Sequence, residues 1–120
     1  SYTNFEYGDL QLSSEEMEVE GTIQASITLK NTGDVEGKEI VQLYLRDLVA
    51  STTRPVKELK GFEAVSLAPG ESKTVTFEIN EEMLQFYNAN RKWEAEAGEF
   101  EVFIGGNSRD LQKATFSLKK

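Results

Sequence analysis

The sequence predicts an all-β protein: a two-sheet antiparallel β-sandwich of about seven strands with one short helical turn. Three observations lead to this fold class. Apolar and polar residues alternate with a period of two in several segments, turn residues separate those segments, and 120 residues suit a single domain, 1–120. Because each alternating strand hides only one apolar face, two sheets must press these faces together.

The most regular strands carry apolar residues at every second position, which one face of a strand would bury. The inward-facing sets are Ile23, Ala25, Ile27 and Leu29; Val75, Phe77 and Ile79; Phe100, Val102 and Ile104; and Ala114, Phe116 and Leu118. Most residues between them are polar, so we expect each of these strands to have one buried side and one side that faces water.

Two other segments depart from simple alternation. Near the N-terminus the apolar phase changes between residues 5–7 and 10–12, so we expect a bulge or kink between the two halves. In the segment 39–46 the second face is also partly apolar, because it carries Ile40 and Tyr44. A strand with two apolar faces suits the middle of a sheet, or a sheet whose outer face is covered.

Turn residues separate these strands. Pro69-Gly70 suits the centre of a type II turn, because proline fixes φ and glycine accepts a positive φ. The segments 31–34 and 105–107 supply further turns. The segment 80–84 is predicted to form the helical turn, because its first residue, asparagine, can cap it and two glutamates follow.

Composition excludes several classes of function. The 13 Lys and Arg against 21 Asp and Glu give a net charge of −8, which repels phosphate, so we expect no nucleic-acid partner. No apolar run is long enough to span a membrane, and no membrane partner is expected. Histidine and cysteine are absent. This removes the commonest general base and metal ligand together with thiolate chemistry, and we expect no cofactor and no metal.

Three motifs stand in a characteristic order along the chain: RPVKELKGF at 54–62, LAPGESK at 67–73 and WEAEAGEF at 93–100. The segments 31–33, 37–45 and 105–110 complete the order. Together they resemble the fibronectin type III-like domain at the C-terminus of family-three glycoside hydrolases, the β-glucosidase and β-xylosidase group. Ala97 departs from the pattern, since the family commonly has proline there.

The resemblance implies an immunoglobulin/fibronectin type III-like sandwich that accompanies a catalytic barrel and a second α/β domain. The catalytic carboxylates would belong to those domains, so no catalytic residue is assigned here. We interpret the chain, which begins with Ser1, as a piece of a larger multidomain enzyme. Its predicted role is that of a non-catalytic accessory domain that packs on the parent's catalytic domains. The alternatives are a carbohydrate-binding module with weak glycan contact, or a protein-interaction module.

The compartment stays open between a periplasmic or secreted parent and a cytoplasmic one, because proteins without cysteine occur in either. Within the first motif, Leu59 and Phe62 look like buried residues. The loop before it carries apolar residues among turn residues, which is typical of a contact surface. The candidates for contact between domains are Tyr2, Leu48, Val49, Arg54, Pro55, Leu59 and Phe62.

Two other groups of residues have a structural and a functional interpretation. Glu94, Glu96, Glu99 and Glu101 could form an acidic stripe that holds Ca²⁺, although charged residues are usual on an exposed strand face. Tyr2, Tyr44, Tyr87 and Trp93 could stack on sugars. For Tyr44 and Trp93 we favour packing within the sandwich or against a neighbouring domain, because aromatic residues are more often core than ligand platform.

Overall fold

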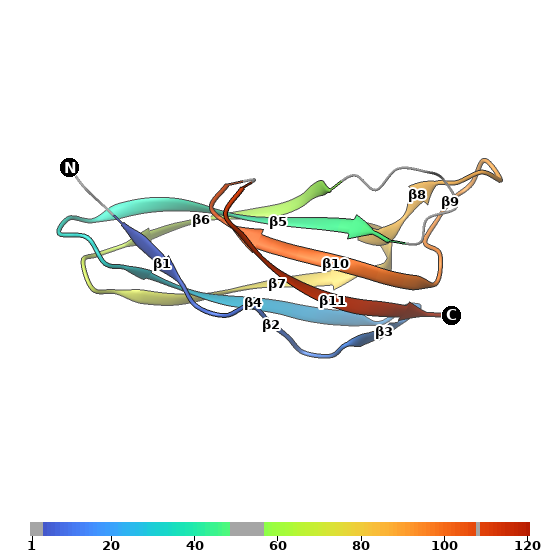
Figure 1. The fold of residues 1–120 in the computed structure, drawn as a ribbon, viewed down its shortest axis with the longest axis horizontal. Helices are drawn as coiled ribbons and strands as arrows, with labels where there is room; N and C mark the ends of the chain where they lie inside the picture. Colours follow the sequence, from blue (N-terminus) through green and yellow to red (C-terminus); the bar gives the residue numbers. More distant parts are fainter. Residues whose placement is uncertain (1–3, 49–56, 108) are drawn as a thin grey trace.

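The computed structural model describes residues 4–48, 57–107 and 109–120 (Figure 1). In these residues the structure has eleven strands and one 3-10 helix: β1 (Phe5–Tyr7), β2 (Gln11–Leu12), β3 (Glu16–Glu18), β4 (Thr22–Asn31), β5 (Gly37–Asp47), β6 (Glu58–Leu67), β7 (Ser72–Asn80), η1 (Glu81–Leu84), β8 (Phe86–Tyr87), β9 (Trp93–Glu94), β10 (Gly98–Gly105) and β11 (Leu111–Lys119).

The long strands form two layers (Figure 1). A four-stranded sheet has the order β1-β4-β2, with β7 also paired to β4, and a five-stranded sheet has the order β3-β11-β10-β5-β6. All pairs are antiparallel except β3 with β11, which is parallel. Strands β8 and β9 form a separate hairpin. The predicted β-sandwich is therefore confirmed.

The core lies between the two sheets and is made of the residues that the alternation selects. Of the predicted inward-facing residues, all are buried except Phe77 and Ala114, which are partly buried and pack against the core. The rings of Phe100 and Phe116 are stacked and buried in this core, with 5.5 Å between centroids. Complete burial of each large apolar side chain stabilises the fold by roughly 1.5–3 kcal/mol.

The N-terminal segment crosses from one sheet to the other. β1 and β2 pair with β4 on either side of the expected kink, and β3 then pairs with β11 in the five-stranded sheet. Gln112 on β11 holds the kink from the opposite sheet: its Oε1 accepts from the Leu10 N–H at 2.8 Å, and its Nε2 donates to the Gly8 carbonyl at 2.5 Å. The change of phase in the sequence thus marks a kink within the segment that pairs with β4, and the chain crosses to the five-stranded sheet only after β2.

A second tie joins the same segment to β5. The Tyr7 hydroxyl donates to Glu39 Oε2 at 3.0 Å. Burial, and then the adjacent Glu39 carboxylate, raise the pKa of Tyr7 above its usual value, so the phenol stays protonated and keeps donating. Gly106 makes room for this bond, because a Cβ there would stand 2.5 Å from Glu39 Oε2.

The predicted type II turn and the predicted helical turn are confirmed. Gly70 has a φ of 81°, and the Glu71 N–H donates to the Ala68 carbonyl at 3.0 Å, as in a type II turn. Asn80 caps η1, because its Oδ1 accepts from the Met83 N–H at 3.1 Å.

No helix in the described parts of the chain is both long and apolar enough to cross a membrane.

Two expectations need correction. Leu59 and Phe62 do not belong to the core: their side chains are 52% and 68% exposed. The strand number also exceeds the prediction, since the described residues contain five strands of two or three residues. The reason is local: the N-terminal strand is broken by its kink, and a small hairpin forms in the segment between η1 and β10.

Candidate functional site

The outer face of the five-stranded sheet is apolar near its centre. Register places Phe103 of β10 beside Tyr44 of β5, and Tyr44 beside Leu59 of β6. Phe62 and Ile40 lie on the same side of β6 and β5. These five residues are called the apolar outer face below. Leu59, Phe62 and Ile40 are exposed, and the rings of Tyr44 and Phe103 are partly covered.

A β-bulge places two of these side chains together. Gly61 pairs with Leu43 and Leu59 pairs with Tyr44, so one residue, Lys60, has no partner on β5. The extra residue shifts the alternation, and Leu59 and Phe62 come to the same face although they are three positions apart. The spacing that suggested burial in the sequence is thus the spacing that brings both residues onto the outer face.

Two cations lie over the aromatic rings of this face. The Lys57 Nζ is 5.2 Å from the centroid of Phe103 and 5.5 Å from that of Tyr44. The Cζ of Arg46 is 5.5 Å from the centroid of Phe103. Cation–π contacts of this length contribute about 0.5–1 kcal/mol at exposed sites, and they hold the rings in place. The Tyr44 hydroxyl also donates to Gln42 Oε1 at 2.5 Å.

Glu101 fixes the cationic side of the apolar outer face. It is 6% exposed, and its Oε1 accepts from Arg46 Nε at 2.8 Å and also from the Arg46 Nη2. Its Oε2 lies 3.1 Å from Lys113 Nζ. Burial alone would raise the pKa of Glu101, but the hydrogen bonds and charges of Arg46 and Lys113 outweigh it and hold the pKa below its usual range.

Two members of the predicted acidic stripe, Glu94 and Glu101, have structural partners. Glu101 binds two cations, and Glu94 Oε1 accepts from Asn88 Nδ2 at 2.6 Å. Among the described residues no group of three or more acidic side chains is arranged to hold a metal ion.

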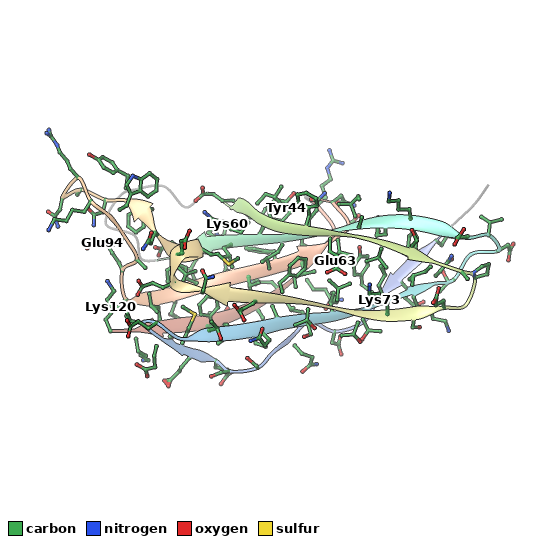
Figure 2. All side chains as sticks on the ribbon, turned by 180° about the vertical axis from the view of Figure 1, so that it is seen from behind. Tyr44, Lys60, Glu63, Lys73, Glu94 and Lys120 are labelled. Carbon is green, nitrogen blue, oxygen red and sulfur yellow. The ribbon has the colours of Figure 1, made fainter. Side chains whose placement is uncertain are left out.

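A different ion pair joins the two sheets at their edge, where Lys73 Nζ of β7 lies 3.5 Å from Glu63 Oε2 of β6 (Figure 2).

The sequence identified part of this face. Leu59 and Phe62 are on it, and Leu48, which is 44% exposed, follows the end of β5. Tyr2, Val49, Arg54 and Pro55 lie outside the described residues. Sequence reasoning missed Phe103 as a member of the face. Its signal was present, because Phe103 is an aromatic residue in the otherwise polar phase of β10.

A second exposed feature is the hairpin of β8 and β9, which projects beyond the end of the sandwich where β5 ends (Figure 1). Tyr87 and Trp93 pair across it, and their side chains are 53% and 69% exposed. The expectation that Trp93 packs within the sandwich is therefore wrong. A neighbouring domain remains the other packing partner that the sequence suggested.

Comparison with known proteins identifies the fold family. Residues 39–108 match the family described as "Fibronectin type III-like domain". The chain belongs to this family. It is 48% identical to the "Periplasmic beta-glucosidase" of Salmonella typhimurium over 118 residues, which are 98% of this chain and 15% of that protein. It is 40% identical to a "Beta-xylosidase" of Formosa agariphila over 121 residues, 99% of this chain and 17% of that one.

A solved structure agrees with the sequence relatives. The β-glucosidase of Listeria innocua, in complex with gluconolactone, superposes with a TM-score of 0.92 at 40% identity, over 99% of this chain and 16% of that one. The fibronectin type III-like chain thus spans about one sixth of the length of these relatives. The resemblance to the fibronectin type III-like domain of β-glucosidases and β-xylosidases is thereby confirmed.

Proposed function

We propose that this fibronectin type III-like domain is a non-catalytic packing domain of a larger glycoside hydrolase that acts on β-glucosides or β-xylosides. It docks its apolar outer face on the catalytic domains of the same polypeptide and stabilises their arrangement. The observation that carries the proposal is the exposed group of Ile40, Leu59 and Phe62 on one sheet. The occupant follows from the relatives, in which this domain is about one sixth of the length.

Exposure of apolar side chains in a group is the physical reason for docking. Soluble proteins rarely leave large contiguous apolar surfaces in water, and such surfaces mark interaction sites. Covering Leu59 and Phe62 would contribute up to roughly 1.5–3 kcal/mol each. The bulge and the cations over the rings hold this surface in one shape before it is covered, which reduces the entropy lost on docking.

The proposal is tested in the full-length enzyme with the double substitution Leu59→Asp and Phe62→Asp. Both side chains are exposed in the isolated domain, so the fold should tolerate the change. At a docked interface, each carboxylate would lose its water without gaining a partner. We therefore expect the melting temperature of the full-length enzyme to fall by several degrees, or one melting transition to separate into two, whereas the melt of the isolated domain stays unchanged.

The matched control places the same two charges on the opposite sheet. Thr74→Asp and Thr76→Asp alter exposed side chains of β7, on the outer face of the four-stranded sheet. This control should leave both the full-length enzyme and the isolated domain unchanged. Equal losses in the two double variants, or no loss in the first, would contradict docking through the five-stranded sheet.

A further inference from the structure

The β8–β9 hairpin holds two aromatic rings in solvent. Tyr87 and Trp93 face each other across the hairpin, with 5.8 Å between ring centroids and 55° between ring planes. More than half of each side chain is exposed. Because the planes are tilted, the two faces that remain open point in different directions and form a wedge rather than a flat platform.

A buried asparagine shapes the tip between the rings. Asn88 is 4% exposed, and its Oδ1 accepts from the Asn90 N–H at 2.9 Å and from the Lys92 N–H at 3.2 Å. The Asn88 N–H donates to the Lys92 carbonyl, and the Arg91 N–H to the Asn88 carbonyl. Arg91 takes a φ of 60°, which this tight turn requires. The turn that joins the two ring-bearing strands is therefore fixed before any ligand arrives.

The surroundings of the rings are polar. Asn90, Arg91 and Lys92, the three residues before Trp93, are all exposed, and Glu94 follows it. The centre of a protein–protein interface is usually depleted of charge and continuous in its apolar area. An isolated aromatic pair beside hydrogen-bonding groups suits a pyranose, which offers C–H groups to a ring face and hydroxyls to its neighbours.

We propose that the hairpin binds β-linked gluco- or xylo-oligosaccharides, with Trp93 as the stacking face and Tyr87 as the second wall. This inference rests on the proposed function in one respect, the choice of β-linked glucose and xylose as the sugars. In β-linked glucose and xylose the ring substituents are equatorial, so both faces of the ring carry C–H groups. These groups are drawn to the negative face of an indole. The exposed residues Asn90, Arg91 and Lys92 of the turn between the two strands bind the equatorial hydroxyls.

The test uses this chain itself, because Trp93 is its only tryptophan and reports the site directly. Cellopentaose, laminaripentaose and xylopentaose are titrated while the Trp93 emission is followed. We expect a saturable change with at least one sugar. Tyr87→Ala should weaken that binding by about tenfold, the order expected for the loss of one stacked ring. Affinity electrophoresis in gels with soluble β-glucan or xylan should show retardation of the unchanged chain and none of Trp93→Ala.

Phe62→Ala is the matched control, because Phe62 is 68% exposed and Trp93 is 69% exposed, but Phe62 lies on the apolar outer face. It should bind sugar as the unchanged chain does. An unchanged emission and mobility with every sugar would overturn the proposal, and so would equal losses in Phe62→Ala and Trp93→Ala. If the Trp93 emission changes on contact with the other domains of the polypeptide but not with any sugar, the hairpin is a docking element and the proposal is wrong. None of these results depends on whether Leu59 and Phe62 dock.

Discussion

The two sheets of the sandwich share one kind of inner face and differ in their outer faces. On the four-stranded sheet the outer residues of β4 and β7 are polar, and their hydroxyls pair across the strands: Ser26 with Thr76 at 3.0 Å and Thr28 with Thr74 at 3.3 Å. On the five-stranded sheet the outer face also carries polar and charged residues, but Ile40, Tyr44, Leu59, Phe62 and Phe103 form an apolar group on it. One face suits water, and the other offers apolar surface to a partner.

This difference separates what the fold needs from what a partner needs. Both sheets fold because their inner faces exclude water, and either type of outer face is compatible with a strand. The outer faces of β4 and β7 carry threonines, which have a high β-propensity and can face water without a binding partner. The strands β5, β6 and β10 would form without aromatic and aliphatic residues on their outer face. The proposed docking gives a reason for the presence of these residues.

The largest expected effect distinguishes an inner from an outer phenylalanine. Phe77 points between the sheets, packs against the core and pairs with Ala25, whereas Phe62 is 68% exposed. In the isolated chain Phe77→Asp should prevent folding, because it removes core packing worth about 3–5 kcal/mol and brings a charge into the core. Phe62→Asp should change the free energy of unfolding by no more than about 0.5 kcal/mol. Urea denaturation followed by circular dichroism measures both.

A cooperative melt of Phe77→Asp close to that of the unchanged chain would show that the phase assigned to β7 is wrong. A large loss in Phe62→Asp would show that the isolated domain itself uses the outer face. Either result would contradict the distinction between an inner face that the fold needs and an outer face that it does not need.

The inner faces could be predicted from the sequence because burial imposes a strict period of two. Ile23, Ala25, Ile27 and Leu29 show it without interruption, and all four are buried. Leu59 and Phe62 were misread as core, since their spacing fits neither phase of a regular strand. The bulge at Lys60 explains this spacing, because it brings Leu59 and Phe62 to the same face. A bulge depends on how the strand pairs with β5, and this pairing cannot be predicted from the local sequence.

The candidate site could be predicted only in part, for a related reason. The two apolar phases of β5 indicated a covered outer face, and Ile40 and Tyr44 are on it. Phe103 joins them only because β10 pairs with β5 in a register that no short motif encodes. Trp93 was assigned to packing on the general behaviour of aromatic residues, and a two-residue strand gave no alternation that could have corrected this assignment.

A smaller effect is expected at Glu101, which supports the cationic side of the apolar outer face. Removal of its charge by Glu101→Gln should reduce the free energy of unfolding by about 1–3 kcal/mol at neutral pH, because Arg46 and Lys113 lose the negative charge that they pair with. Arg46 would then be held less firmly over Phe103. Chemical denaturation of both proteins at several pH values measures the loss.

The pH dependence has a definite sign. The pKa of Glu101 is lowered in the folded protein from the ordinary value of 4.5, so its stabilisation is present above that value and is lost as the pH falls through the folded pKa. The difference between the unchanged chain and Glu101→Gln should therefore be constant near neutrality and shrink in acid. A difference that grows as the pH falls would contradict the assigned ion pairs. Thr115→Val, a neighbour of Glu101 on β11, is the control.

The smallest effect is expected on the outer face of the four-stranded sheet, and it is the most direct test of the comparison. Thr76→Val removes a hydroxyl that lies in solvent 3.0 Å from the Ser26 hydroxyl. Valine keeps the β-branched shape, so the free energy of unfolding should change by no more than about 0.5 kcal/mol. The same small change is expected in the full-length enzyme, because the proposed docking through the five-stranded sheet leaves this face in water. A loss confined to the full-length enzyme would mean that the hydroxyl face is occupied as well, and the polar and apolar outer faces would then both have to be treated as interfaces.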